Sequence, residues 1–128
     1  MVIFERKLLP EIDRFIVRQN YSENKMIIGT DEIQRIRGIV EPIASRRGGF
    51  ERIYLFGSRA RGEETEKSDY DFCVFPDDNV SLTGLAALML DLSEGLKSEV
   101  DIVDATAFKK GNAFISEIER DGILIYER

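Results

Sequence analysis

Residues 57–72 read GSRARGEETEKSDYDF, and this stretch joins two apolar runs. The run before it, residues 53–56, is IYLF, and the run that it opens, residues 72–75, is FCVF. Short runs rich in β-branched and aromatic residues are typical of buried strands. A loop with small residues at one end and paired carboxylates at the other can hold a phosphate group and a divalent metal ion together. We therefore expect a ligand site where the two strands meet this loop.

The acidic end of the loop predicts a metal site. Asp69 and Asp71 stand two residues apart on a predicted strand, so both side chains leave the same face. Two carboxylates that close repel, and one of them tends to take up a proton unless a cation compensates. Asp101, in the apolar run at residues 100–103, supplies a third carboxylate if the strands are neighbours. Asp104 is a weaker candidate because it faces the other side of that strand.

Three carboxylates around one or two divalent ions form a phosphoryl- or nucleotidyl-transfer site, which stabilises the attacking and leaving oxygens. We predict Asp69, Asp71 and Asp101 as catalytic residues and metal ligands, with Asp101 nearest the incoming nucleophile as metal ligand or general base. A lone Asp-x-Asp pair is weak evidence, because aspartate often terminates strands. The combination of strand, Gly-Ser, ten intervening residues, Asp-x-Asp and a third strand with its own aspartate favours function over chance.

The small-residue end of the loop predicts phosphate binding. Gly57 lets the backbone approach a ligand closely, and the Ser58 hydroxyl can donate to a triphosphate together with the first amides of a short following helix. We assign Gly57, Ser58 and Arg61 to the nucleotide-binding set. Spacing alone does not decide which of Arg59, Arg61 and Lys67 points toward the phosphates.

Hydrophobic periodicity predicts the remaining elements. Thr30 is the expected N-cap of a helix that ends at Gly48-Gly49, and Ser81 the expected N-cap of a helix reaching residue 96. The other expected elements are helices over residues 4–19 and 108–120 and strands over residues 52–56, 70–75, 100–104 and 123–126. This order predicts a layered domain of the α/β or α+β class.

Composition excludes several classes of function. The chain has 128 residues, enough for one domain, and no histidine, which excludes Ser-His-Asp and Cys-His catalysis and the usual zinc sites. It has no Gly-Lys-Ser/Thr sequence of a P-loop, and the segment that begins at Asp69 fails the EF-hand pattern. The net charge is −6, and the acidic balance of residues 51–128 argues against direct nucleic-acid binding. A single cysteine favours a cytoplasmic location, and no apolar run approaches the length of a membrane span.

Three segments together resemble the minimal nucleotidyltransferase (MNT) domain of the DNA polymerase β-like nucleotidyltransferase superfamily: FGSRARGE at residues 56–63, KSDYDF at residues 67–72 and VDIV at residues 100–103. The resemblance extends over about residues 30–127. We accordingly expect a minimal nucleotidyltransferase domain over residues 30–128 and an N-terminal helical extension over residues 1–29.

The resemblance implies a small mixed β-sheet flanked by helices, with ATP as substrate and Mg²⁺ as cofactor. In it Asp69 and Asp71 match the metal-binding pair, Asp101 the third carboxylate, and Gly57 and Ser58 the phosphate-binding turn. Stand-alone members resemble antitoxins paired with a HEPN-type toxin, which they silence by transferring AMP from ATP to a toxin tyrosine. Two other functions stay open, a binding subunit that neutralises its partner by contact alone and nucleotidyl transfer to a small molecule. The partner, the acceptor and any homo-oligomer are not determined by the sequence.

Overall fold

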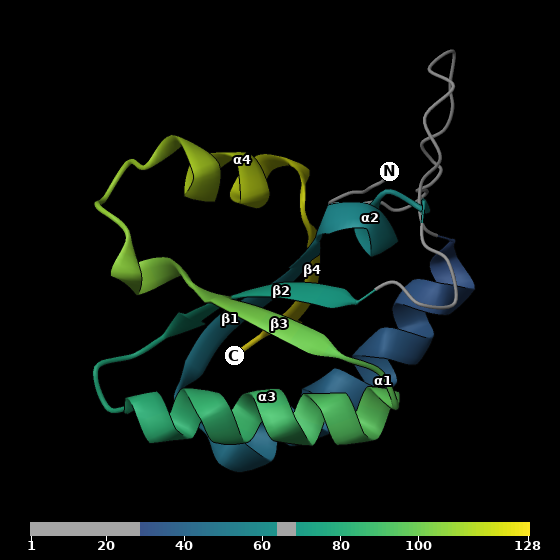
Figure 1. The fold of residues 1–128 in the computed structure, drawn as a ribbon, viewed down its shortest axis with the longest axis horizontal. Coiled ribbons are helices and arrows are strands. Elements are labelled where there is room, and N and C mark those ends of the chain that lie inside the picture. Colours follow the sequence, from purple (N-terminus) through teal and green to yellow (C-terminus); the bar gives the residue numbers. More distant parts are fainter. Residues whose placement is uncertain (1–28, 64–68) are drawn as a thin grey trace.

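A four-stranded sheet with the strand order β3-β2-β1-β4 forms the centre of the fold (Figure 1). The computed structural model describes residues 29–63 and 69–128. The strands are β1 (Phe50–Phe56), β2 (Tyr70–Pro76), β3 (Val100–Asp104) and β4 (Ile123–Glu127). β1 pairs antiparallel with β2 and with β4, whereas β2 and β3 run parallel, so the sheet is mixed, as predicted.

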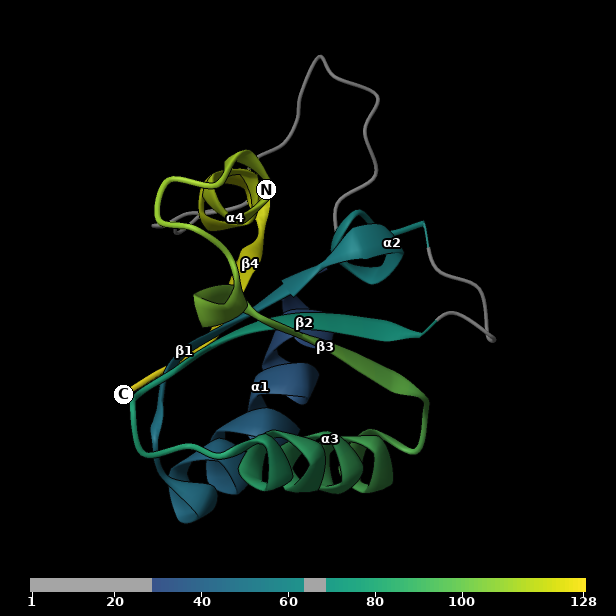
Figure 2. The same cartoon turned by 60° about the vertical axis from the view of Figure 1, so that its left-hand side comes forward.

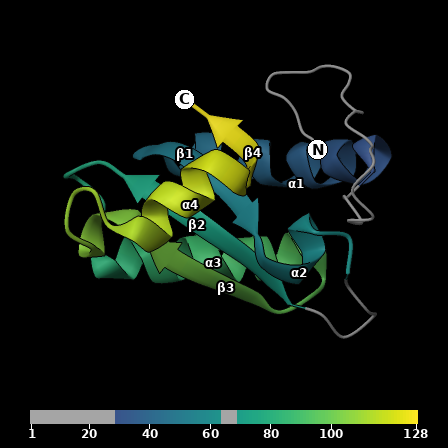
Figure 3. The same ribbon diagram turned by 90° about the horizontal axis from the view of Figure 1, so that it is seen from above.

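Helices cover the two faces of the sheet unequally. The two long helices, α1 (Thr30–Arg47) and α3 (Leu82–Leu96), lie together against one face (Figure 2). The other face carries α4 (Ala113–Asp121), with the one-turn helix α2 (Gly57–Ala60) at the end of β1 (Figures 1 and 3). A 3-10 turn, η1 (Ala105–Ala107), follows β3 directly. The parallel β2–β3 connection is the crossover through α3 that such a pair requires.

Alternation along the strands divides the core into two parts. On β2, Phe72 and Val74 join the main core under α1 and α3, whereas Cys73 between them faces the smaller core under α4. On β1, Leu55 and Tyr54 divide in the same way. The strand interiors are therefore apolar on both faces, which is the pattern expected for a sheet covered by helices.

Most predicted boundaries are confirmed to within a few residues. Ser81 caps α3 by accepting a hydrogen bond from the Gly84 amide at 3.1 Å, and α1 stops at Gly48, whose φ of 74° is left-handed. The prediction that Thr30 is an N-cap is wrong. Thr30 is the first helical residue, and the extended Gly29 before it takes the N-cap position without a side-chain hydrogen bond.

The helix predicted from residue 108 begins later than expected. Asp104 caps η1 by accepting from the Thr106 amide, and Gly111 then adopts a φ of 82° that interrupts any helix. The Asn112 side chain accepts from the Phe114 and Ile115 amides and begins α4 there. The helix predicted over residues 4–19 lies outside the described residues. Across the described ranges, no helix has the length and apolar character needed to cross a membrane.

Two substitutions on α3 should show how much free energy of unfolding is lost when a core side chain, rather than a surface one, is truncated. Leu88 is fully buried and Leu90 on the same helix is 66% exposed. Leu88→Ala should lower the free energy of unfolding by about 2–5 kcal/mol, because it removes buried apolar surface and leaves a cavity. Leu90→Ala, the matched control, should change it by less than about 0.5 kcal/mol. Urea unfolding followed by circular dichroism measures both, and equal losses would contradict the packing of α3.

Candidate active site

Strand pairing brings two of the three predicted carboxylates side by side. Asp71 on β2 is the register partner of Asp101 on β3 and of Phe56 on β1. Paired residues point to the same face of a sheet, so these three side chains share the face that carries α4. Asp69, half-buried, lies two residues before Asp71 at the entrance to the strand. The expectation that the strands are neighbours is thus confirmed for Asp71 and Asp101.

The turn at Gly57 lies against the Asp71 carboxylate of this pair. Gly57 has a φ of 80°, a left-handed conformation that side chains rarely adopt. A Cβ atom added there would collide with the Asp71 carboxylate and would lie 3.2 Å from its Cγ. Glycine is therefore required both for the backbone conformation and for the space beside Asp71. The predicted phosphate turn therefore lies directly against Asp71 of the predicted metal pair.

The short helix α2 presents the other predicted ligands beside this turn. Ser58 is half-buried, and its carbonyl accepts from the Glu63 amide at 2.9 Å, which closes the turn. The first amides of a helix have no intrahelical acceptor and are oriented to donate outward. The exposed Arg61 donates through Nε to the Glu63 carboxylate at 2.8 Å.

Of the two other basic residues considered for phosphate binding, Arg59 contacts an aromatic ring: its guanidinium carbon lies 4.1 Å from the centre of the Tyr70 ring. Lys67 lies outside the described residues.

A buried tyrosine between the two aspartates, which the sequence did not single out, connects the site to α1. Tyr70 is 2% exposed and points to the main core, opposite its acidic neighbours. Arg35 donates to the Tyr70 hydroxyl at 2.6 Å and forms a two-bonded ion pair with Glu32, at 2.7 and 2.8 Å. With Arg59 on the ring, these contacts join α1, α2 and β2. Arg35 and Tyr70 are 35 residues apart, so periodicity gave no signal of this contact.

The electrostatics of the site disfavour the ionised form of its central carboxylate. Burial raises the pKa of Asp71 above its usual value, and the negative charges of Asp101 and Asp69 raise it further. The positive charge of Arg61 acts in the opposite direction. A divalent cation among these carboxylates would remove the conflict.

The donor set fits a hard divalent cation in chemistry and in register, because carboxylate oxygens are the ligands that Mg²⁺ prefers. Asp71 and Asp101 share a face, and the Gly57 turn leaves open the space that a Cβ would fill. Within residues 29–63 and 69–128, no three acidic or cysteine side chains already converge as a metal cluster. Mutual repulsion between carboxylates opposes such convergence, so a bound cation would draw the side chains together by rotation about their torsions.

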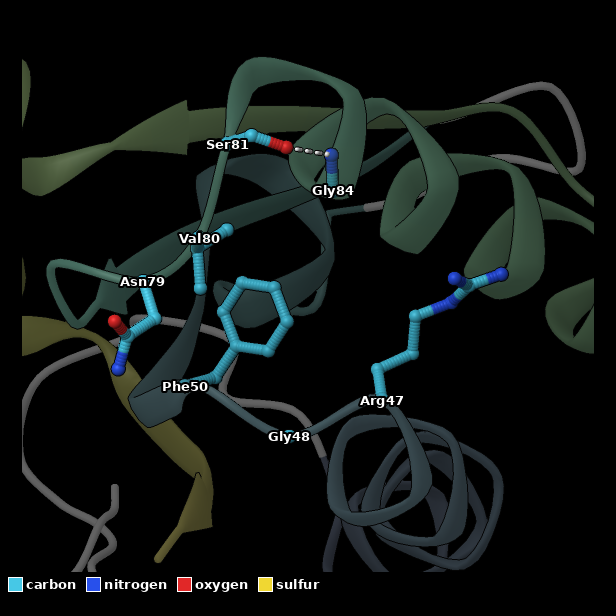
Figure 4. Close-up of a pocket in the computed structure, with 7 residues that line it drawn as sticks. All are labelled: Arg47, Gly48, Phe50, Asn79, Val80, Ser81 and Gly84. Carbon is cyan, nitrogen blue, oxygen red and sulfur yellow. Dashed lines mark hydrogen bonds between the residues drawn. The ribbon is translucent and has the colours of Figure 1, made fainter.

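A separate pocket of about 160 Å³ lies at the opposite end of β1 (Figure 4). Its lining residues are Arg47, Gly48, Phe50, Asn79, Val80, Ser81 and Gly84. Two of its polar side chains already have partners within the fold, because Ser81 caps α3 and Arg47 donates to Asp91 at 2.7 Å. Phe50 pairs with Pro76, whereas Phe56 pairs with Asp71, so this pocket is remote from the carboxylates. The carboxylate face is the stronger candidate for chemistry.

Comparisons with known proteins show the family to which the sequence is similar. The family model described as "Polymerase beta, Nucleotidyltransferase" matches residues 40–128. MJ0435 of Methanocaldococcus jannaschii, named as a proposed protein adenylyltransferase, is 38% identical over 71 residues, which are 56% of this chain and 75% of that protein.

Two solved structures share the fold. A protein described as a minimal nucleotidyltransferase superposes with a TM-score of 0.62 at 31% identity, over 73% of this chain and 92% of that one. A complex of a tri-AMPylated Shewanella oneidensis HEPN toxin with its MNT antitoxin superposes with a TM-score of 0.56 at 21% identity, over 75% of this chain and 73% of that one.

The raised pKa of Asp71 predicts that its ionised carboxylate lowers the free energy of unfolding at neutral pH. An acid whose pKa is higher in the folded state than in the unfolded state binds more protons when folded, so stability falls as the pH rises through that interval. Asp71→Asn should therefore be more stable than the wild type at pH 7, and the difference should shrink toward pH 4, near the ordinary aspartate pKa of about 3.9. Chemical denaturation at both pH values measures it.

The control is Asp78→Asn, which removes one negative charge from an exposed turn at the far end of β2. A variant Asp71→Asn that is less stable than the wild type at pH 7 would contradict the electrostatic interpretation.

Proposed function

Because this chain belongs to the polymerase beta nucleotidyltransferase family, and is a nucleotidyltransferase of the minimal type, we propose that it transfers AMP from ATP to a protein hydroxyl group. The observation that carries the proposal is the register of Asp71 with Asp101, directly beside the left-handed turn at Gly57. In the proposal the Gly57 turn binds phosphate, and the carboxylates beside it would hold Mg²⁺. The name of MJ0435 supports transfer to a protein rather than to a small molecule.

In this proposal Gly57 admits the triphosphate to the backbone, and the Ser58 hydroxyl and the first α2 amides donate to its terminal phosphates. Arg61, exposed beside them, exchanges its Glu63 partner for phosphate oxygens. Asp69, Asp71 and Asp101 hold Mg²⁺, which when bound supplies positive charge to the attacking and leaving oxygens.

The acceptor approaches Asp101 from the β3 edge of the sheet. β3 is the last strand on that side, and Asp101 is exposed there. Its carboxylate takes the proton of the acceptor hydroxyl. The hydroxyl oxygen then bonds to the α-phosphorus while the bond from that phosphorus to the oxygen bridging it to the β-phosphate breaks, so pyrophosphate leaves and AMP stays on the acceptor.

We propose a HEPN-type toxin as the partner and one of its tyrosines as the acceptor, so that the chain acts as an antitoxin. The AMPylated HEPN toxin in the Shewanella oneidensis complex, whose antitoxin shares this fold, supports that choice. The alternative that the sequence leaves open is neutralisation of the partner by contact alone.

The intact mass of the toxin distinguishes AMP transfer from neutralisation by contact alone, because only transfer changes that mass. Incubation of the chain with a cognate HEPN-type toxin, ATP and Mg²⁺ should add one or more AMP groups to the toxin, seen by intact mass spectrometry. Asp69→Asn and Asp71→Asn should each slow this addition by about a hundredfold or more, because charge stabilisation at the reacting phosphate is lost. Asp78→Asn should leave the rate unchanged. Neutralisation without any mass change, retained in both site variants, would establish the contact mechanism instead.

The phosphate turn is tested by calorimetric titration with Mg·ATP. Ser58→Ala removes one hydrogen-bond donor to a charged phosphate, a loss of about 1.5–3 kcal/mol. The Kd should therefore rise about tenfold or more. Ser45→Ala, an exposed serine in the last turns of α1, is the control and should bind as the wild type does. An unchanged Kd for Ser58→Ala would remove this hydroxyl from the site.

A further inference from the structure

Three phenylalanines form a partly open aromatic surface on the face that carries the carboxylates. The Phe114 ring lies 5.8 Å from the Phe56 ring, at 83° to it, and 5.9 Å from the Phe108 ring. Phe108 is 38% exposed and Phe114 is 40% exposed. We call Phe56, Phe108 and Phe114 the aromatic platform. Two large rings that keep more than a third of their surface in water are not explained by core packing.

The anchoring of α4 does not depend on the platform. Ile115 and Ile118 on the same helix are 8% and 4% exposed and pack into the smaller core with Tyr54 and Cys73. They hold α4 on the sheet, while Phe114 lies at the first turn of the helix with an exposed ring. The exposed aromatic surface is therefore available for a ligand.

The platform is continuous with the candidate active site. Phe56 precedes Gly57 directly in the chain and is the register partner of Asp71. Figures 2 and 3 show α4 and α2 on the same side of the sheet, with the end of β1 leading into α2. A nucleotide whose phosphates bind at Gly57 and Asp71 thus begins beside the platform.

The direction of the reaction decides which part of the ligand meets the aromatic rings. In the proposed function the terminal phosphates bind at α2, at the end of β1, and the acceptor arrives at the open β3 edge. The platform lies on the same face, beginning at Phe56, within reach of a nucleoside attached to those phosphates. The nucleoside is therefore the part of the ligand that would occupy the platform.

We propose that Phe114 and Phe108 form a stacking platform for the nucleobase of the bound nucleotide. Every nucleobase has a flat π face, and stacking on exposed aromatic side chains is a common way to bind one without hydrogen bonds. Because the three platform residues carry no polar side-chain atom, the base is held by stacking alone. This inference rests on the proposed function, since it requires a nucleotide at the Gly57 turn.

The test separates the base from the phosphates by comparing two ligands on the full chain. Isothermal titration calorimetry measures the Kd of Mg·ATP and that of Mg·tripolyphosphate, which lacks the nucleoside. We expect Phe114→Ala to raise the Kd for ATP about tenfold or more and to leave the Kd for tripolyphosphate unchanged. Phe114→Tyr, which keeps the ring, should bind ATP as the wild type does.

Two further variants keep the result interpretable. Phe108→Ala leaves the contact between Phe56 and Phe114 in place. It should also weaken the binding of ATP without changing the binding of tripolyphosphate. Leu90→Ala removes an exposed apolar side chain on α3, on the other face of the sheet, and should change neither Kd. Thermal unfolding of each variant checks that it is folded.

The outcomes distinguish the two proposals. If the wild type binds ATP and tripolyphosphate equally, or if Phe114→Ala and Phe108→Ala bind ATP as the wild type does, the platform does not hold the base, and the proposed function is unaffected. If the wild type binds neither ligand, the proposed function fails and the platform assignment fails with it. Selective weakening of ATP by both phenylalanine variants supports the assignment.

Discussion

The contact between the Gly57 turn and the Asp71 carboxylate is the constraint on which the site depends. It exists because β1 and β2 pair antiparallel with Phe56 opposite Asp71, so that the end of one strand meets the start of the next. A residue with a Cβ has no room at position 57, and its backbone would be strained at a φ of 80°. The Gly57 turn and the acidic side chains are thereby held together by the sheet itself, and strand pairing fixes their relative positions.

The same strand pairing brings several carboxylates together at partly buried positions. Burial there raises the free energy of their ionised forms. The raised pKa of Asp71 comes from burial first and from Asp101 and Asp69 second, so the fold keeps together groups that destabilise it. Functional sites commonly carry perturbed carboxylates of this kind. In an all-polar surface loop such groups would separate. Here the parallel pairing of β2 with β3 holds Asp101 opposite Asp71.

One face of the sheet holds the main core, and the other holds the candidate active site. The face under α1 and α3 holds the main core, and the network of Glu32, Arg35 and Tyr70 ties α1 to the strand residue between the two aspartates. The face under α4 is less completely covered and holds the carboxylates and the aromatic platform. Because successive strand residues alternate between faces, the well-packed face fixes the backbone that positions the open one.

The sequence by itself determined the elements with strong local signals. Alternating or continuous apolar runs placed the four strands, Ser81 placed the start of α3, and the spacing from Gly57 to Asp71 predicted both halves of the candidate site at one connection between strands. Local signals failed where several residues compete for one role, as at Thr30, where Gly29 took the N-cap position, and at residues 108–112, where Gly111 and Asn112 delayed α4.

Only the tertiary structure decided that Asp101 is opposite Asp71, that Arg35 reaches Tyr70, and that Phe114 meets Phe56. Each of these contacts joins residues at least 30 positions apart, and they depend on strand order and helix placement, which a periodicity of two or of 3.6 residues does not encode.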